Sequence, residues 1–201
     1  MKLSSKLVTL LFGLVVSSGA SANIIELNIS DNLVKYENQF FTGTAEVTAD
    51  GKVVQDGNNW VALEGPYEIT ADSVLNIAFS STVLGEIHGI GFDNNTSYTN
   101  LDAASQNRFF QFGGTQFFGI QDFNTYTAAD LDSVVEFTIN LGDYFTGTFN
   151  NIIFINDRDG KWDATSTYFQ PLQVSGVNAV NTASTLGLFL IMIASLLVRR
   201  R

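Results

Sequence analysis

The sequence predicts an all-β protein that folds as a single antiparallel, jelly-roll-like β-sandwich. Short apolar or alternating runs recur along the chain, and clusters of Asn, Asp and Gly separate them, which is the pattern of short strands joined by turns. Only residues 127–133 read as a helical turn. The chain has 17 glycines and two prolines, and its apolar runs are too regular for a disordered segment.

The expected strands follow one another through most of the chain. In order, they cover residues 24–29, 45–48, 52–55, 60–63, 67–69, 74–80, 86–92, 108–112, 134–140, 152–155 and 168–174. Turn-forming pairs end many of them, and these pairs include Asp50-Gly51, Asp56-Gly57, Gly65-Pro66, Asn94-Asn95, Gly113-Gly114 and Asp159-Gly160. Many short strands with almost no helix indicate a sandwich rather than a mixed fold.

The first 22 residues read as a secretory signal peptide. Lys2 and Lys6 precede an apolar run, which leads to the small residues Ala20, Ser21 and Ala22. Cleavage is therefore expected after Ala22. The sandwich domain is then expected over residues 23–175, followed by a polar linker over residues 176–182. The protein is therefore expected to be exported.

The last segment, residues 183–201, reads as an apolar helix that ends in Arg199, Arg200 and Arg201. Its 16 residues before the arginines would span roughly 24 Å as a helix, which is short for a hydrocarbon core of about 30 Å. The arginines should stay on the cytoplasmic side. An anchored intermediate at the inner membrane is expected, before the protein reaches the cell surface, the outer membrane or the extracellular matrix.

The tail resembles the PEP-CTERM sorting signals of Gram-negative bacteria. A small-residue motif, an apolar helix and an arginine cluster follow one another over residues 180–201, although the chain has Val180 to Ala183 where that family has Val-Pro-Glu-Pro. The resemblance implies an exosortase-type processing enzyme as a partner. A plain tail anchor is the alternative.

Composition excludes several classes of function. All 20 acidic residues lie within residues 23–182, against five basic ones, so this segment carries a net charge of −15. Such a surface repels nucleic acid and suits the binding of cations. The chain has no cysteine, which excludes disulfides, thiol catalysis and zinc–thiolate sites.

Six motifs in order resemble a β-sandwich module of secreted marine bacterial proteins that is regarded as carbohydrate-binding-like. They lie at residues 57–60, 74–79, 85–93, 114–116, 144–147 and 156–159, and residues 166–169 also fit. The resemblance covers about residues 44–175. It implies a non-catalytic cell-surface or extracellular-matrix protein that binds polysaccharide, with calcium as a structural aid. The first alternative is a structural or adhesion protein of the matrix without sugar binding, and the second is a small polysaccharide-active enzyme.

Two oxygen-rich clusters at strand ends are candidate calcium sites. The first holds Asp93 and Asn94, and the second holds Asp157 and Asp159. Hard oxygen ligands on loops are what Ca²⁺ requires, although Asp and Asn also end strands by satisfying turn backbone. Neither cluster has the spacing of an EF-hand.

Four aromatic residues are candidate platforms for sugar rings. Trp162, Tyr98 and Tyr126 lie in predicted loops, whereas Trp60 alternates with Ala62 on a strand and is expected in the core. Pairs such as Phe117-Phe118 must point one ring to each side of the backbone.

The single histidine does not predict catalysis. His88 is expected on one strand face with Glu86, Ile90 and Phe92, and no serine-nucleophile motif accompanies it. We therefore expect a packed, hydrogen-bonded histidine. No pattern singles out two carboxylates for glycoside hydrolysis.

Overall fold

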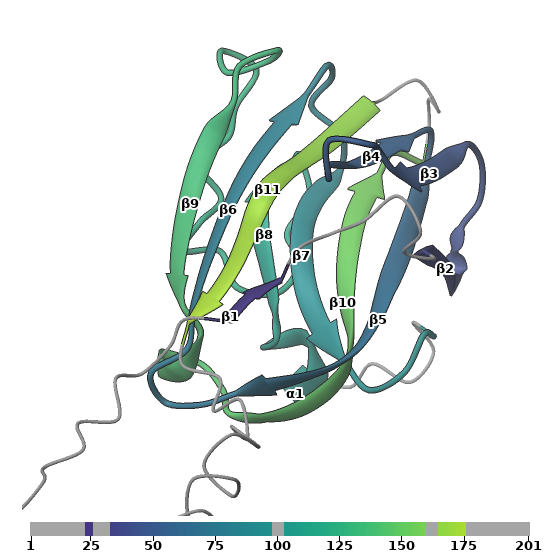
Figure 1. Ribbon diagram of the computed structural model, residues 1–201. Coiled ribbons are helices and arrows are strands. Elements are labelled where there is room, and N and C mark those ends of the chain that lie inside the picture. Colours follow the sequence, from purple (N-terminus) through teal and green to yellow (C-terminus); the bar gives the residue numbers. More distant parts are fainter. Residues whose placement is uncertain (1–22, 26–32, 98–102, 160–164, 176–201) are drawn as a thin grey trace, which may run out of the picture.

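The computed structural model describes residues 23–25, 33–97, 103–159 and 165–175, and these form two antiparallel sheets packed as a sandwich (Figure 1). The predicted fold class is therefore confirmed. The strands are β1 (Asn23–Ile25), β2 (Leu33–Phe40), β3 (Thr44–Val47), β4 (Val53–Asp56), β5 (Asn59–Ile69), β6 (Val74–Ser81), β7 (Ile87–Asp93), β8 (Phe109–Gly113), β9 (Val135–Asn140), β10 (Gly147–Asp157) and β11 (Thr165–Ser175). Two short helical segments lie between strands, α1 (Ala103–Gln106) and η2 (Leu141–Asp143).

The two sheets exchange strands along the chain. Sheet A has the order β3-β4-β11-β6-β9, with β1 also paired to β11, and sheet B has the order β2-β5-β10-β7-β8. The pairs of named strands are all antiparallel. Because β9, β10 and β11 fall in sheets A, B and A in turn, the chain crosses between layers as jelly-roll sandwiches do.

Three details of the predicted elements differ. The expected strands at 60–63 and 67–69 are one continuous strand, β5, which passes through Gly65 and Pro66. The strand β2 was not predicted, because its sequence mixes charged and apolar residues and lacks regular alternation. Residues 127–133 form turns instead of a helix, with Asp130 N donating to Thr127 O at 3.0 Å.

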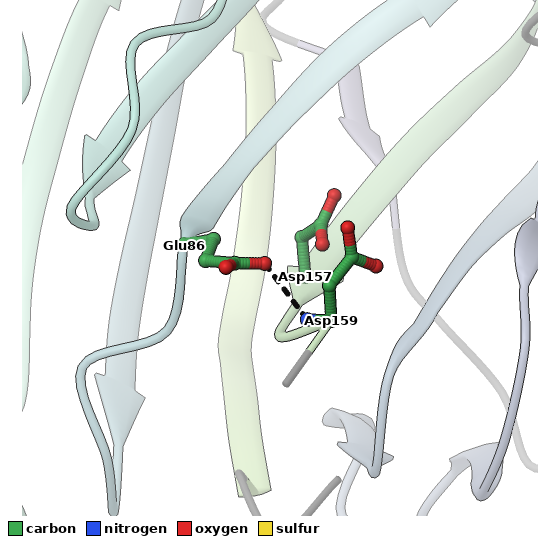
Figure 2. Close-up of side chains that lie close together, drawn as sticks. All are labelled: Glu86, Asp157 and Asp159. Carbon is green, nitrogen blue, oxygen red and sulfur yellow. Dashed lines mark hydrogen bonds between the residues drawn. The ribbon is translucent and has the colours of Figure 1, made fainter. Parts of the chain in front are cut away.

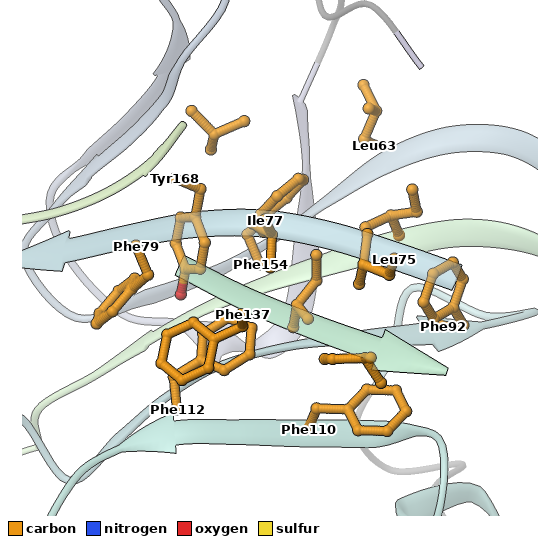
Figure 3. Close-up of a cluster of buried hydrophobic side chains, with 14 of the residues drawn as sticks. Leu63, Leu75, Ile77, Phe79, Phe92, Phe110, Phe112, Phe137, Phe154 and Tyr168 are labelled. Carbon is orange, nitrogen blue, oxygen red and sulfur yellow. The ribbon is translucent and has the colours of Figure 1, made fainter. Parts of the chain in front are cut away.

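The main core lies between the sheets and is rich in aromatic rings (Figure 3). Phe112 of sheet B stacks on Phe137 of sheet A, with ring centroids 4.3 Å apart and an interplanar angle of 12°. Burial of such large apolar rings supplies the dominant favourable term of folding. The labelled members of the core are Leu63, Leu75, Ile77, Phe79, Phe92, Phe110, Phe112, Phe137, Phe154 and Tyr168.

A second apolar cluster covers the outer face of sheet B. Strand residues alternate between faces, so Trp60 and Ala62 point away from the main core, whereas Val61 and Leu63 point into it. We call this the outer-face cluster, and its buried members are Tyr36, Trp60, Ala62, Ile87, Phe109, Phe118, Ile153 and Ile155. Trp60 is 1% exposed, which confirms that it belongs to the packed interior.

The first and last described strands lie together, since Asn23 of β1 pairs with Val174 of β11. The expected signal peptide (1–22), linker (176–182) and tail (183–201) lie outside the described residues. Among the residues that the structure describes, no helix is long and apolar enough to cross a membrane.

Candidate functional site

Three carboxylates meet at one end of sheet B. Glu86 comes directly before β7, Asp157 ends β10, and Asp159 follows two residues later. Because Asp157 pairs with Ile87 across the β10–β7 ladder, the start of β7 and the end of β10 lie side by side. One oxygen from each carboxylate lies within 4.8 Å of the other two, as Figure 2 shows. We call Glu86, Asp157 and Asp159 the carboxylate triad.

The triad is held by the backbone that carries it. The Asp159 N–H donates to Glu86 Oε2 at 2.7 Å (Figure 2), and the Glu86 N–H donates to Asp157 O at 2.7 Å. Glu86 was expected on the strand face of His88, but β7 begins only at Ile87, and the Glu86 carboxylate lies with Asp157 and Asp159.

Asp157 sits in an unusual electrostatic environment. Its side chain points to the outer face of sheet B and is only 8% exposed, and it accepts a hydrogen bond from Trp60 Nε1 at 3.1 Å. The pKa of Asp157 is raised to about 6, first by burial and then by the negative charges of Asp159 and Glu86, while the hydrogen bond from Trp60 lowers it. A cation placed here would stabilise the ionised form.

A loop with an exposed phenylalanine borders the triad on one side. Thr115 N donates to Gly85 O at 3.1 Å, and Gln116 N donates to Glu86 O at 3.0 Å. Phe118 is then buried against Trp60, with ring centroids 5.2 Å apart. The adjacent Phe117 faces the other way and is 84% exposed. The predicted division of the Phe117-Phe118 pair is therefore confirmed.

A second exposed ring lies on a segment that Asn58 links to the triad. Phe41 is 56% exposed, and its backbone N–H donates to Asn58 O at 3.1 Å. The side chain of Asn58 in turn donates from Nδ2 to Asp159 Oδ1 at 3.0 Å. The two chain segments approach closely at glycines, since a Cβ on Gly57 (φ +95°) would lie 2.9 Å from the Cα of Gly43.

Together these residues form a candidate binding surface, which we call the rim: Phe41, Glu86, Phe117, Asp157 and Asp159. Three large hydrophobic side chains are exposed in the described part of the chain, Phe41, Phe117 and Val134. The segment of Phe117 hydrogen-bonds to Glu86, and the segment of Phe41 is linked through Asn58 to Asp159. Sequence reasoning missed Phe41 and Phe117 as site residues, although the Phe117-Phe118 pair carried a usable signal.

The other predicted calcium cluster lies at the opposite end of sheet B. In the β10–β7 ladder, Asp93 pairs with Asn151 at one end, and Ile87 pairs with Asp157 at the other. Asp93 is 2% exposed, accepts from Tyr36 Oη at 2.7 Å, and forms an ion pair with Arg108 at 3.4 Å. Its oxygens thus bind groups of the protein itself, and the two predicted clusters do not form one site.

Of the three predicted sugar platforms, only Tyr126 lies within the described residues. Tyr126 is 2% exposed, and its hydroxyl accepts from Ser81 N and donates to Ser81 O, both at 3.0 Å. The prediction for Tyr126 is therefore wrong, because the ring packs edge-on against Phe79 in the core. Trp162 and Tyr98 lie outside the described residues.

His88 is a structural residue, as predicted. It is fully buried, and its Nε2 accepts from Gly85 N at 2.7 Å, while Nδ1 lies 3.1 Å from Ser166 Oγ. Burial lowers the pKa of His88 to about 4, so the imidazole is neutral at physiological pH. It orders the turn that leads to Glu86.

The fold and the rim define a β-sandwich protein with a polar and aromatic surface at one end of a sheet. Neither a protein-family model nor a curated protein sequence matches the chain.

Several solved structures have a similar fold at low similarity. One is a family 29 carbohydrate binding module, with a TM-score of 0.42 and 13% identity over 81% of this chain and 97% of its own. Another is a mutant family 29 module complexed with mannohexaose, with a TM-score of 0.41 and 14% identity over 78% of this chain and 92% of its own. A third is a mutant complexed with cellulohexaose, with a TM-score of 0.41 and 13% identity over 78% of this chain and 93% of its own. These values are too low to carry an argument about the ligand of this chain.

Proposed function

We propose that this protein is an exported, non-catalytic polysaccharide-binding protein of the cell surface or extracellular matrix. The observation that carries the proposal is the rim, where two segments with exposed phenylalanine rings hydrogen-bond to Glu86 and, through Asn58, to Asp159 of the carboxylate triad. An exposed ring covers the apolar face of a pyranose, and nearby carboxylates accept hydrogen bonds from its hydroxyl groups. Apolar surface with a few placed polar groups is the usual lining of a small-molecule site.

Calcium at the carboxylate triad is part of this proposal. Oxygens that bind one Ca²⁺ lie about 2.3–2.6 Å from it, so two of them can be up to about 5 Å apart. The three carboxylates meet this limit, because one oxygen of each lies within 4.8 Å of the others. Burial raises the pKa of Asp157 most, and the negative charges of Asp159 and Glu86 raise it as well. A bound cation would remove that repulsion and order the rim.

Export and anchoring complete the proposal. The signal peptide would direct the chain out of the cytoplasm, and the tail would hold it at the inner membrane until an exosortase-type enzyme processes it. The protein would then act at the cell surface, the outer membrane or in the matrix. The high negative charge of residues 23–182 disfavours anionic glycans and nucleic acid.

The test is a glycan array probed with the full chain in millimolar calcium and in chelator. Binding to neutral polysaccharide that weakens in chelator supports the proposal. Absence of binding to every glycan contradicts it and favours the alternative of an adhesion protein that contacts other proteins.

A second candidate function is a small polysaccharide-active enzyme. The specific observation is that Asp157, with its pKa near 6, lies beside two other carboxylates, and a raised pKa is typical of a general acid in glycoside hydrolysis. Release of reducing ends from a bound polysaccharide, lost in Asp157→Asn, would select this alternative. Unchanged polysaccharide length after long incubation would reject it.

A further inference from the structure

A polar hollow of about 620 Å³ lies at the end of sheet B opposite the rim. Asn151 lines it, and Asn151 is six positions before Asp157 on β10, which corresponds to about 20 Å along a strand. The side chains that line this asparagine hollow are Glu64, Asn94, Asn95, Thr96, Asn150 and Asn151.

An irregularity in sheet B creates the hollow. The β10–β5 ladder shifts register between Phe149 and Asn151, so Asn150 has no direct partner. On β5 the chain opposite is Gly65-Pro66, and proline has no N–H to give to a ladder. The ring of Tyr67 lies across Gly65, where a Cβ would come within 2.5 Å of it. A side chain at position 65 would therefore displace the ring beside the hollow.

Hydrogen bonds fix the asparagines in place. Asn94 Oδ1 accepts from Asn150 N at 3.1 Å, and Asn150 Nδ2 donates to Asn94 O at 3.2 Å. Asn151 Nδ2 donates to Asp93 O and to Asn95 O, each at 3.3 Å. The walls are thus preorganised before a ligand arrives, which lowers the entropy lost on binding.

Other polar groups of the hollow are left to interact with a ligand. Within the described residues, no hydrogen bond or ion pair involves the Glu64 carboxylate or the side-chain amide of Asn95, and both residues are exposed. An amide offers a donor and an acceptor at one position. Sugar hydroxyls both donate and accept, so they match such a lining better than a purely anionic or cationic group does.

The charge of the hollow narrows the ligand class. Its described lining holds one carboxylate and no basic side chain, which disfavours uronic acids and sulfated sugars. The volume lies within the range of about 300–1,000 Å³ that is usual for small-molecule sites.

We propose that the asparagine hollow is a second, calcium-independent binding site for a neutral saccharide. The choice of a saccharide as the ligand rests on the proposed function. The hollow itself does not depend on the rim. Asn151 and Asp157 alternate with the core residues Ile152 and Phe154 on β10, so both sites open on the outer face of sheet B. At about 20 Å apart, they can hold two short oligosaccharides, or two segments of one longer polysaccharide chain.

The test is calorimetric titration of the full chain in detergent with trioses of glucose, mannose, galactose and glucuronic acid, which are too short to reach both sites at once. The wild type should bind two equivalents of one neutral triose and none of the glucuronic acid triose. Glu64→Gln/Asn95→Ala should remove one equivalent, and Phe117→Ala should remove the other. The matched control is Glu136→Gln/Asn140→Ala, which makes the same chemical changes at exposed positions on β9 of sheet A. It should keep both equivalents.

The outcomes separate the two sites. If Glu64→Gln/Asn95→Ala binds as the wild type does, the hollow proposal is overturned, whether or not the rim binds. If Phe117→Ala leaves binding unchanged while Glu64→Gln/Asn95→Ala removes one equivalent, the rim proposal is wrong and the hollow proposal is supported. In chelator the equivalent assigned to the hollow should persist, and its loss would identify a cation site in place of a saccharide site. An unchanged melting temperature in each variant shows that the fold survives.

Discussion

The Trp60 indole N–H donates a hydrogen bond to Asp157 Oδ2 at 3.1 Å, which joins the outer-face cluster to the carboxylate triad. Trp60 in turn stacks on Tyr36 with ring centroids 5.8 Å apart, and the Tyr36 hydroxyl donates to Asp93 at the other end of the sheet. A buried chain of contacts thus fixes Asp157. The position of the triad depends on packing as much as on loop structure.

Stability should decrease with rising pH in the absence of calcium. The folded pKa of Asp157 is about 6, above its ordinary value of 3.8. The stabilising contribution is therefore fully present below about pH 4 and is lost as pH rises through 6. The difference corresponds to about 3 kcal/mol at most. Denaturant unfolding of wild type and Asp157→Asn between pH 4 and 8 measures it, and the variant should show a flatter profile. Equal slopes would exclude Asp157 as the cause.

Calcium should raise the melting temperature at pH 7. A ligand that binds only the folded state stabilises it by RT ln(1 + [L]/Kd), and the triad exists only in the folded chain. Asp159→Asn should reduce the shift, whereas the control Asp72→Asn, an exposed acid in the turn between β5 and β6, should retain it. Scanning calorimetry in millimolar calcium and in chelator provides the measurement. Identical curves in both would leave the triad as a set of turn residues.

Phe117→Ala should weaken polysaccharide binding at the rim at least tenfold without changing the melting temperature. The ring is 84% exposed, so its removal costs little folding energy, whereas loss of a stacking platform removes apolar contact with the sugar. Val134→Ala is the matched control, because Val134 is 55% exposed outside the rim. Affinity electrophoresis in gels that contain the polysaccharide gives both values. Equal retardation of the two variants would remove Phe117 from the site.

Phe118→Ala should give the opposite result. Phe118 packs against Trp60 and Phe109 with centroid distances of 5.2 and 5.3 Å, and truncation of a buried phenylalanine costs about 3–5 kcal/mol. Chemical unfolding should show this loss. A stable Phe118→Ala variant would mean that the loop is not anchored by its ring.

Export should leave Asn23 as the first residue of the mature protein, since the small residues that precede it follow the apolar run closely. N-terminal sequencing of the cell-surface form checks this. An intact Met1 at the surface would contradict the export proposal. Deletion of Arg199 to Arg201 should in addition mislocalise the protein, because these charges set its orientation in the membrane.

The sandwich was predictable because alternation and turn residues are local signals. The runs that became β6 and β9 differ from their predicted bounds by a single residue. The strand β2 was missed, since its pairing with β5 shifts register between Lys35 and Phe40 and its exposure follows no simple alternation.

The sites were harder to predict because they depend on distant parts of the chain. Asp157 and Asp159 were identified as ligands, but Glu86 and Phe117 join them only through the β10–β7 ladder and the backbone bonds of the 114–118 loop. Tyr126 looked like a loop aromatic, and nothing local in the sequence indicates that its hydroxyl satisfies the backbone of Ser81. The asparagine hollow arises from a register shift, which side-chain periodicity does not reveal.

The course of β11 has a mechanical consequence. Its first residues lie beside the ends of β4 and β6 near the rim, and its last residue, Ser175, lies beside Val74 at the far end, from which the chain continues toward the tail (Figure 1). Along the chain, Ser175 is therefore the described residue nearest to the expected tail, and the rim lies at the other end of β11. Tension between a glycan bound at the rim and an anchored tail would act along β11. It would load the ladders of β11 with β4 and β6 in shear, so many hydrogen bonds would resist the force together instead of opening one at a time.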